Sequence, residues 1–312
     1  MLPERPDTAA TARNENMGAM NLLSNPDTTP PAAIPSSDSQ ADPAQQLRQW
    51  LRPLRRVFVL TGAGCSTASG IPDYRDVDGQ WKRTPPVTYQ AFTGDARINA
   101  RYWARSFIGW PRMAQAHPND VHRALARYED DGRISSLITQ NVDGLHQRAG
   151  SREVIDLHGR IDAVVCLGCA AQQARSVVQE QLAAMNPDWA GLEAATAPDG
   201  DADLDGHDFS RFRVPACDRC GGMLKPDVVF YGENVPRTRY HQAQAALAAS
   251  HAVLVVGSSL MVYSGYRFVR QAAEAGVPIA ILNRGRTRAD DLASLKLEAD
   301  AGPTLSAAVA NA

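Results

Sequence analysis

The feature that most constrains this chain is the segment of residues 61–76, TGAGCSTASGIPDYRD. It follows the apolar run of residues 57–60, which is typical of a buried parallel strand. Gly62 and Gly64 let the backbone turn tightly and approach a phosphate, as in the first turn of a dinucleotide fold. Residues 70–72, Gly-Ile-Pro, then interrupt the helix that such folds continue. The segment therefore predicts a bound dinucleotide with a mobile loop over it.

Strand-like and helix-like segments alternate after residue 50. Apolar runs occupy residues 57–60, 136–139, 154–157, 252–256 and 278–282, and helical stretches occupy residues 120–128, 239–250 and 265–275. The alternation predicts an α/β fold, a Rossmann-like parallel sheet with helices on both faces. Polar residues follow every run, at 61–64, 140–143, 158–159, 257–259 and 283–285. Because ligands bind outside the carboxyl ends of parallel strands, these five segments predict one site.

Composition argues against several other classes of protein. The net charge of -2 indicates no broad nucleic-acid-binding surface, and no apolar run approaches the roughly 18 residues of a membrane span. Residues 1–45 are rich in proline and lack apolar periodicity, which predicts a disordered tail. The tail has neither the apolar core of a secretory signal nor the Arg-rich character of a transit peptide. We therefore expect a cytoplasmic protein with a solvated tail, or one whose true start is Met17 or Met20.

Four of the five cysteines form two C-x-x-C pairs, and their numbers are Cys166, Cys169, Cys217 and Cys220. Glycine-bearing knuckles of this kind are typical of one structural Zn²⁺ held by four thiolates. The long spacer, residues 170–216, is compatible with this because loop-closure entropy grows slowly with length. Disulfides and a redox dithiol are the alternatives. Cys65 lies in the glycine loop, where we expect a small buried residue rather than a nucleophile.

The spacer between the knuckles interrupts the alternation of strands and helices. It contains an Ala- and Gln-rich stretch, which predicts a helix, and then an acidic stretch at residues 186–209 without Lys or Arg. The simplest interpretation of the acidic stretch is a solvated surface loop, and binding to a specific partner is the alternative.

Taken in this order, the motifs resemble those of the sirtuins, which are NAD-dependent protein deacylases. The resemblance covers about residue 46 to the end. It is carried by the 61–76 segment and the cysteine pairs, and by TQNVDGLHQRAG at 139–150, LHG at 157–159, PDVVFYGE at 226–233 and GSSL at 257–260. RYWAR at 101–105, GWP at 109–111 and NRGRTR at 283–288 are most similar to the class II branch. Cys65 and Tyr74 stand where many members have Ile and Phe.

The resemblance implies catalytic roles for His158, Asn141 and Asp143. In the implied reaction the acyl oxygen of a modified lysine attacks C1′ of the nicotinamide ribose, nicotinamide leaves, and an alkylimidate forms. His158 would then be the general base on a ribose hydroxyl, a task that suits imidazole with its ordinary pKa of about 6.5. Asn141 and Asp143 would lie near the nicotinamide ribose and carboxamide. A structural histidine and turn-forming polar residues are the alternatives.

The resemblance also implies a set of residues that bind NAD, which would be consumed as a co-substrate. Backbone groups would hold the phosphates, side chains after the strands would hold the riboses, and a loop that includes an Asp-Tyr-Arg trio would close over the nicotinamide. The expected residues are Gly62, Ala63, Gly64, Ser66, Asp73, Tyr74, Arg75, Gln140, Asn141, Asp143, Gly257, Ser258, Ser259, Asn283, Arg284, Gly285 and Ala301. A surface ion pair is the alternative for Asp73 and Arg75.

The segment of residues 228–232 is similar to the sirtuin substrate loop. It would bind the substrate peptide as an added strand through residues that include Val228, Phe230 and Gly232, and Val228 and Phe230 would line an apolar tunnel for the acyl-lysine. An ordinary strand that leads into a turn is the alternative. Tyr102 and Arg105 share one helical face and occupy the region where some sirtuins recognise acidic acyl groups. They suggest a preference for a dicarboxylic or otherwise unusual acyl chain, with ordinary helix packing as the alternative.

We therefore predict NAD-dependent removal of acyl groups, acetyl or longer and acidic ones, from protein lysines, with release of nicotinamide and O-acyl-ADP-ribose. Protein mono-ADP-ribosyl transfer and a non-catalytic NAD- and zinc-binding regulator are the alternatives. The expected partners are acyl-lysine proteins or peptides, and neither nucleic acid nor membrane. The expected organisation is a tail at 1–45 and a catalytic domain at 46–312. Its large part would comprise 46–160 and 224–312, and its inserted zinc module about 161–223.

Overall fold

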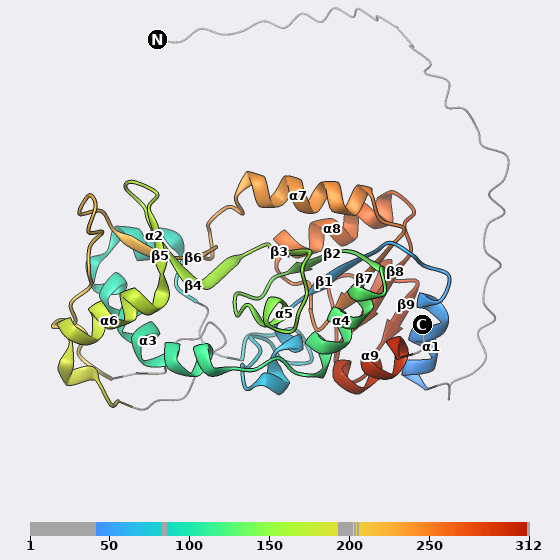
Figure 1. Cartoon of the computed structure of the whole chain (residues 1–312), viewed down its shortest axis with the longest axis horizontal. Helices are drawn as coiled ribbons and strands as arrows, with labels where there is room; N and C mark the ends of the chain where they lie inside the picture. Colours follow the sequence, from blue (N-terminus) through green and yellow to red (C-terminus); the bar gives the residue numbers. More distant parts are fainter. Residues whose placement is uncertain (1–41, 83–85, 193–201, 203, 205, 311–312) are drawn as a thin grey trace, which may run out of the picture. The chain divides into compact units, whose positions relative to one another are not determined.

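The computed structural model describes residues 42–82, 86–192, 202, 204 and 206–310 of the 312 residues. The described residues from 42 onward form one compact unit, and most of the predicted tail lies outside the described residues (Figure 1). The predicted end of the tail at residue 45 needs a correction, because helix α1 (Pro43–Leu51) begins earlier. Asp42 caps this helix by accepting from the N–H of Ala44, and Pro43 suits a first turn that needs no N–H.

A six-stranded parallel sheet forms the larger half of the unit, in the order β3-β2-β1-β7-β8-β9. Its strands are β1 (Val57–Thr61), β2 (Ile134–Thr139), β3 (Val154–Asp156), β7 (Ala252–Val256), β8 (Ile279–Leu282) and β9 (Leu295–Leu297). Every residue of β1 and β7 is buried, as expected of central parallel strands. The five predicted strands are confirmed to within two residues at each end. Sequence reasoning missed β9, because three residues are too few to show a period.

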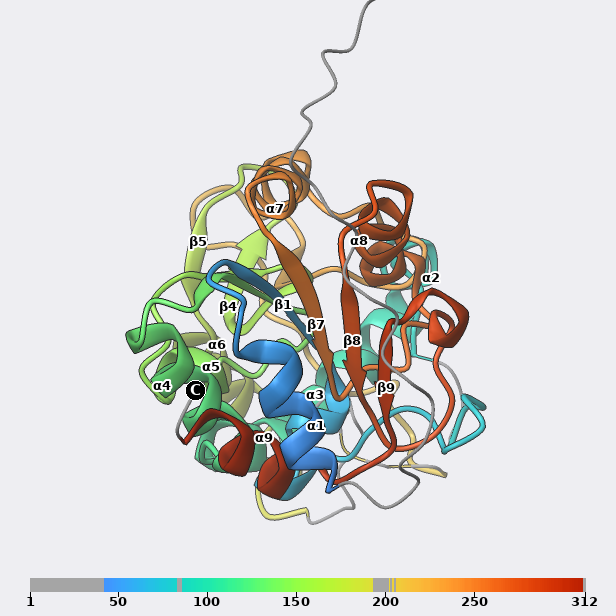
Figure 2. The ribbon, with the colours of Figure 1, turned by 90° about the vertical axis from the view of Figure 1, so that its right-hand side faces the viewer.

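Helices cover both faces of this sheet, which confirms the predicted fold class (Figure 2). Side chains at alternate positions of β1 point to opposite faces: Val57 and Val59 to one, Phe58 and Leu60 to the other. The helices on the first face are α1, α4 (Asp120–Asp130) and α9 (Ala301–Val309). The second face is covered by α7 (Arg237–Ala248) and α8 (Tyr263–Glu274).

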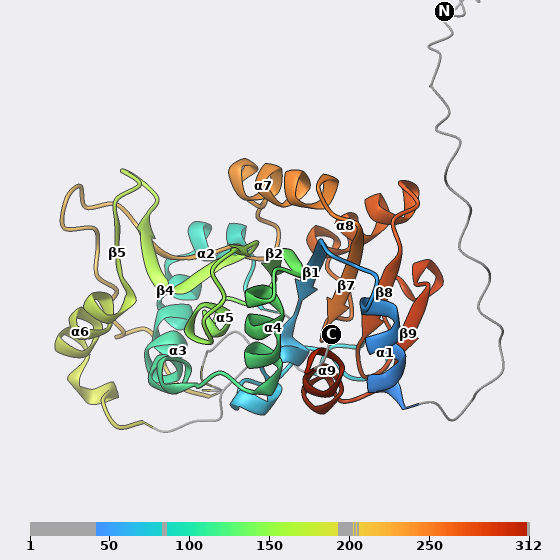
Figure 3. The ribbon, with the colours of Figure 1, turned by 45° about the vertical axis from the view of Figure 1, so that its right-hand side comes forward.

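A second core surrounds a three-stranded antiparallel sheet in the order β5-β4-β6 (Figure 3). Its strands are β4 (Gly159–Cys166), β5 (Gln172–Ala174) and β6 (Leu224–Val228), and its helices are α2 (Tyr89–Gly94), α3 (Ala96–Gln115) and α6 (Arg175–Met185). The predicted boundaries of the zinc module, 161 and 223, do not follow this core. The reason is that α3 buries Trp103 and Phe107 against it rather than against the larger sheet.

Short helices and turns complete the unit. They are α5 (Leu145–Arg148) and the 3₁₀ helices at Ala63–Cys65, Thr67–Ser69, Pro187–Trp189 and Asp290–Leu292. The Ala- and Gln-rich stretch predicted as helical is α6. Of the acidic stretch, residues 193–201, 203 and 205 lie outside the described residues. Within the described part of the chain, no helix is both long and apolar enough to cross a membrane.

Asn119 joins the start of α4 to the glycine loop. Its side-chain oxygen accepts from the N–H of Val121 at 2.9 Å, which caps the helix. Its amide nitrogen donates to the carbonyl of Cys65 at 2.7 Å and to the hydroxyl of Ser69 at 2.9 Å. The buried amide therefore fixes the segment after β1 relative to a helix that packs on the core.

We expect Asn119→Ala to lower the free energy of unfolding by about 2 to 3 kcal/mol, because it removes a helix cap, one buried hydrogen bond and one partly buried hydrogen bond. Thr88→Ala is the matched control. Thr88 caps α2 through one exposed bond to Ala91, so its loss should cost about 1 kcal/mol or less. Urea unfolding followed by far-UV circular dichroism measures both. Equal losses in the two variants would contradict the role assigned to Asn119.

Candidate active site

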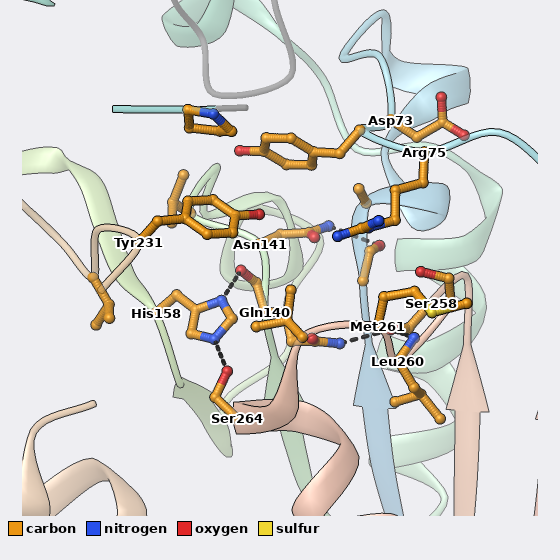
Figure 4. Close-up of a pocket in the computed structure, with 18 of the residues that line it drawn as sticks. Asp73, Arg75, Gln140, Asn141, His158, Tyr231, Ser258, Leu260, Met261 and Ser264 are labelled. Atoms are coloured by element: carbon orange, nitrogen blue, oxygen red, sulfur yellow. Dashed lines mark hydrogen bonds between the residues drawn. The ribbon is translucent and has the colours of Figure 1, made fainter. Parts of the chain in front are cut away.

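The site is a cavity of about 580 Å³ between the carboxyl ends of β1, β2 and β7 and the loops of the second core. Most of the predicted site residues line it, and ten of the lining residues are labelled in Figure 4. The predicted residues that line it are Gly62, Ala63, Gly64, Asp73, Tyr74, Arg75, Tyr102, Gln140, Asn141, His158, Val228, Phe230, Gly232, Gly257, Ser258, Ser259, Asn283 and Arg284. The segments after β1, β2, β3, β7 and β8 therefore meet at one site, as the sequence indicates.

The floor of the cavity consists of backbone from two loops in contact. The N–H of Gly64 donates to the carbonyl of Gly257 at 2.8 Å. A Cβ added to Gly64 would lie 2.9 Å from that carbonyl oxygen, and one added to Gly62 would lie 2.7 Å from the Cβ of Ser258. Only glycine fits at these positions. The loops after β1 and β7 thus present backbone without side chains at the point where the strand order reverses, which suits a pyrophosphate.

A chain of hydrogen bonds holds Asn141 beside this floor. The Asn141 amide donates to the Ser66 hydroxyl at 3.0 Å and to the Gly62 carbonyl at 3.1 Å, and the Ser66 hydroxyl donates to the Asp143 carboxylate at 2.7 Å. Burial raises the pKa of Asp143, while donation from Leu145 and Ser66 opposes the rise. Asn141 lines the cavity, whereas Ser66 and Asp143 do not. The geometry makes Ser66 and Asp143 supports of Asn141.

His158 lies in the turn between β3 and β4, and two hydrogen bonds fix its ring (Figure 4). Nδ1 lies 3.0 Å from the carbonyl oxygen of Gln140. A carbonyl only accepts, so Nδ1 carries the proton, and in the neutral ring Nε2 has the lone pair. Desolvation lowers the pKa of His158 to about 4, with smaller contributions from Arg267 and Arg239. The ring is therefore neutral at pH 7, the form that a general base requires.

The predicted substrate loop is tied to both the histidine turn and the second core. The N–H of Val229 donates to the carbonyl of His158 at 2.8 Å. Lys225 is 4% exposed, and its ammonium group donates to the Val228 carbonyl at 2.6 Å and to the Glu233 carboxylate at 3.1 Å. The same carboxylate accepts from the N–H of Phe230 at 2.9 Å. An ion pair between the buried Lys225 and the half-buried Glu233 thus sets the course of the loop.

Arg105 does not line the cavity, so the predicted pairing of Tyr102 with Arg105 at the acyl group needs a correction. The guanidinium of Arg105 donates to the carbonyl of Ala202 at 2.8 Å, and the N–H of Ala202 donates to the Arg105 carbonyl at 2.9 Å. Tyr102 does line the cavity, with its ring 5.1 Å from that of Phe230. The Tyr–Arg spacing placed both residues on one helix but carried no information about the distant partner of Arg105.

Gly285 and Ala301 are the other predicted cofactor residues that do not line the cavity. Gly285 has φ 82, and a Cβ there would lie 2.4 Å from the carbonyl oxygen of Val77. The N–H of Arg286 donates to the same carbonyl at 2.8 Å. Gly285 therefore holds the loop that contains Asp73 and Arg75, while Ala301 starts α9.

Sequence reasoning missed several side chains of this cavity. Ser264 and Arg267, on the first turns of α8, line it beside His158. Trp81 does not line the cavity but packs against two residues that do: its ring centroid lies 4.0 Å from Cζ of Arg75 and 5.5 Å from the ring of Tyr231. The sequence could have indicated Ser264 and Arg267, because a serine and an arginine stand at the start of the helix after GSSL. It gave no indication of Trp81, which is a lone tryptophan in a loop.

Two buried histidines lie behind the floor. The rings of His122 and His146 are 4.7 Å apart, and Nε2 of His146 lies 3.0 Å from the Thr61 hydroxyl. Desolvation, with a smaller contribution from Arg123, lowers the pKa of His122 to about 4. Desolvation also lowers the pKa of His146 well below its ordinary value, with the neighbouring His122 adding to the effect. Both are neutral in the folded protein at pH 7.

The four paired cysteines meet in the second core, with all four sulfur atoms within 4.8 Å of one another. The Sγ atoms of Cys166 and Cys220 are 3.5 Å apart, and those of Cys169 and Cys217 are 3.8 Å apart. Tetrahedral Zn²⁺ with Zn–S of about 2.3 Å requires sulfur separations of about 3.8 Å. Donation from the N–H of Cys169, followed by that of Gly168, lowers the pKa of Cys166 to about 6. The donor set thus fits one structural Zn²⁺ with no open position.

These features define the class of protein as a Rossmann-like dinucleotide-binding protein with a structural zinc site. The features are the glycine floor at the point where the strand order of the sheet reverses, the neutral histidine beside it, and the inserted four-cysteine module. The model of the Sir2 family matches residues 62–264. The chain is 61% identical over 260 residues to an NAD-dependent protein deacetylase of Bordetella bronchiseptica, covering 83% of this chain and 95% of that protein. This chain belongs to the Sir2 family.

Another relative is the bovine mitochondrial NAD-dependent protein lipoamidase sirtuin-4, 45% identical over 274 residues and covering 87% of each chain. Among solved structures, a Sir2 protein with a p53 peptide and NAD⁺ matches with a TM-score of 0.67 and 30% identity, covering 84% of this chain and 95% of that one. A Sir2 structure with a deacetylated p53 peptide and 3′-O-acetyl ADP ribose matches with a TM-score of 0.69 and 32% identity, covering 84% and 96%. The class II assignment stays a prediction.

We expect Cys169→Ser to lose the zinc that the wild-type protein carries, because a hydroxyl replaces one of four thiolates and zinc binding is coupled to folding of the module. Elemental analysis of the purified protein measures the zinc content. Cys65→Ser is the control, since Cys65 is buried near the cavity floor and donates to the Val256 carbonyl. Retention of stoichiometric zinc by Cys169→Ser would refute the assignment.

Acid should destabilise the protein below pH 6.5 through its buried histidines. Folded His122 binds a proton only near pH 4, whereas the unfolded chain binds one near the ordinary pKa of about 6.5. Between these values the unfolded state holds more protons, so stability falls as pH falls, by up to about 2 kcal/mol per histidine between pH 7 and 5. Urea unfolding at the two pH values should show a smaller loss for His122→Gln than for wild type. The exposed His241, changed to Gln, is the control, and an unchanged pH dependence in His122→Gln would contradict the account.

Proposed function

We propose that this chain removes acyl groups from protein lysines with NAD as a consumed co-substrate. The observation that carries the proposal is the neutral His158, whose Nε2 lone pair is at the cavity beside Asn141 and the glycine floor. The relatives that match over most of this chain are named NAD-dependent protein deacetylases. Solved Sir2 structures hold an acetylated peptide, or NAD⁺ with a peptide, and these support the same assignment.

The residues of the cavity suit distinct parts of the substrates. The backbone at Gly62, Gly64 and Gly257 accommodates the pyrophosphate where a side chain would collide. Asn141, held by Ser66, presents its amide at the nicotinamide end. Nε2 of His158 accepts the proton of a ribose hydroxyl, and the ring then keeps its Nδ1–H on the Gln140 carbonyl. In this assignment Asp143 acts through Ser66 rather than by touching NAD.

The substrate peptide is expected along residues 228–232, with its acyl-lysine directed past Phe230 and Tyr102. These two rings and Phe92 form an apolar wall, with ring centroids 4.9 to 5.2 Å apart. An apolar wall favours acetyl and longer apolar acyl chains. The side chain that would have recognised an acidic acyl group, Arg105, points elsewhere. The absence of nucleic-acid and membrane partners and the cytoplasmic location stay predictions.

Incubation with NAD and acetyl-, long-chain acyl- and succinyl-lysine peptides tests the proposal. We expect nicotinamide and O-acyl-ADP-ribose in equal amounts, and a loss of about 10²-fold or more in His158→Ala, since general bases contribute about 10²- to 10⁴-fold. His241→Ala is the control, because His241 is exposed on α7. ADP-ribose attached to protein would instead support the transferase alternative. If the protein released neither nicotinamide nor deacylated peptide with any of these substrates, only NAD binding would remain.

A further inference from the structure

The second hydrogen bond of His158 involves a residue that no motif singled out. The Ser264 hydroxyl lies 2.7 Å from Nε2 of His158, and Figure 4 shows the serine directly below the ring. Because the Gln140 carbonyl fixes the proton on Nδ1, Nε2 is the acceptor and the serine hydroxyl is the donor. Ser264 therefore bonds to the nitrogen that must receive a proton in the proposed reaction.

The two groups that hold the imidazole come from elements in direct contact. Ser264 is the second residue of α8, and Gln140 follows β2. A Cβ added to Gly265 would lie 2.6 Å from the side-chain oxygen of Gln140, so the first turn of α8 packs closely on that residue. The Gln140 amide in turn donates to the Ser258 hydroxyl at 2.8 Å. Both anchors of the ring thus belong to one packed unit that includes the cavity floor.

We propose that Ser264 is a positioning residue for His158, holding the imidazole in the Nδ1–H tautomer with Nε2 at the cavity. This inference rests on the proposed function. In the free enzyme the hydroxyl keeps Nε2 paired and the ring plane fixed by two bonds rather than one. When a substrate hydroxyl arrives, the serine hydroxyl releases Nε2 by rotation about χ1. The substrate O–H bond then breaks, an N–H bond forms at Nε2, and Nδ1–H remains on Gln140.

Two arginines, Arg267 on α8 and Arg239 on α7, also favour the neutral form of His158, and their effect must be separated from that of Ser264. The other charged groups on the surrounding elements are Asp227 on β6, Asp156 on β3 and Arg160 on β4. Arg239 is paired with Asp227 at 2.7 Å, and Arg160 lies 4.0 Å from Asp156. Arg267 donates to the Ser264 carbonyl at 3.3 Å and packs 4.4 Å from the Tyr240 ring. A change confined to the Ser264 hydroxyl leaves each of these charges in place.

The test is an NMR titration of the His158 imidazole in the zinc-loaded full-length protein without NAD or peptide, with the resonance assigned by its loss in His158→Gln. A donor to Nε2 stabilises only the neutral ring, so Ser264→Ala should raise the pKa of His158 by about 0.5 to 1 unit. Ser264→Thr keeps the hydroxyl and should restore the wild-type value. In turnover assays Ser264→Ala should lower kcat at pH 7 by about 3- to 10-fold with little change in KM for NAD, and move the acidic limb of the pH profile upward.

An unchanged His158 pKa in Ser264→Ala would overturn the proposal, as would an equal fall in kcat for the Ala and Thr variants, because both would mean that the hydroxyl itself has no role. The titration needs no catalysis. If the wild-type protein released no nicotinamide with any peptide, the proposed function would fail, and the positioning role would still be decided by the imidazole pKa.

Discussion

The contact between the loops after β1 and β7 is the constraint on which the rest of the site depends. The Gly64 N–H bonds to the Gly257 carbonyl, and any side chain at either of the glycines 62 and 64 would collide with the opposite loop. This contact brings the ends of two central strands together at the reversal of the strand order. It also fixes Ser66, and through it Asn141 and Asp143, at one edge of the cavity. A floor of backbone is what allows the cavity to receive a phosphate group at close range.

The second core forms one wall of the cavity and contributes no proposed catalytic side chain. Its sheet leads directly from His158 into β4 and returns through β6 to the substrate loop, so the zinc-binding module and the histidine turn are one continuous piece of structure. The ion pair of the buried Lys225 with the half-buried Glu233 holds the substrate loop, and aromatic rings of α2 and α3 pack behind it. The four-thiolate site therefore belongs to the same core that forms this wall of the cavity.

The sequence predicted what depends on local pattern, and the remainder depends on contacts between distant segments. Five parallel strands, the meeting of their polar ends and the four-cysteine cluster followed from apolar runs and C-x-x-C spacing. The partner of Arg105 could not be foreseen, because Ala202 is remote in sequence and bonds only through its backbone groups. Ser264 was missed for the same reason: its hydroxyl matters only because β3 and α8 bring it to Nε2 of His158.

Burial lowers the pKa of His158 and raises the pKa of Asp143. Neighbouring arginines add to the change at His158, whereas hydrogen-bond donors oppose the change at Asp143. For His158, desolvation favours the neutral ring and nearby arginines add to this effect, so the ring is neutral at pH 7. For Asp143, desolvation favours the protonated acid, but the Leu145 N–H and the Ser66 hydroxyl donate to the carboxylate and oppose that effect. The Asp143 carboxylate accepts the Ser66 O–H and so orients that hydroxyl. The Ser66 oxygen can then accept from the Asn141 amide. The direction of that hydrogen-bond chain is therefore set at the carboxylate, and protonation of Asp143 would weaken the acceptor at its end.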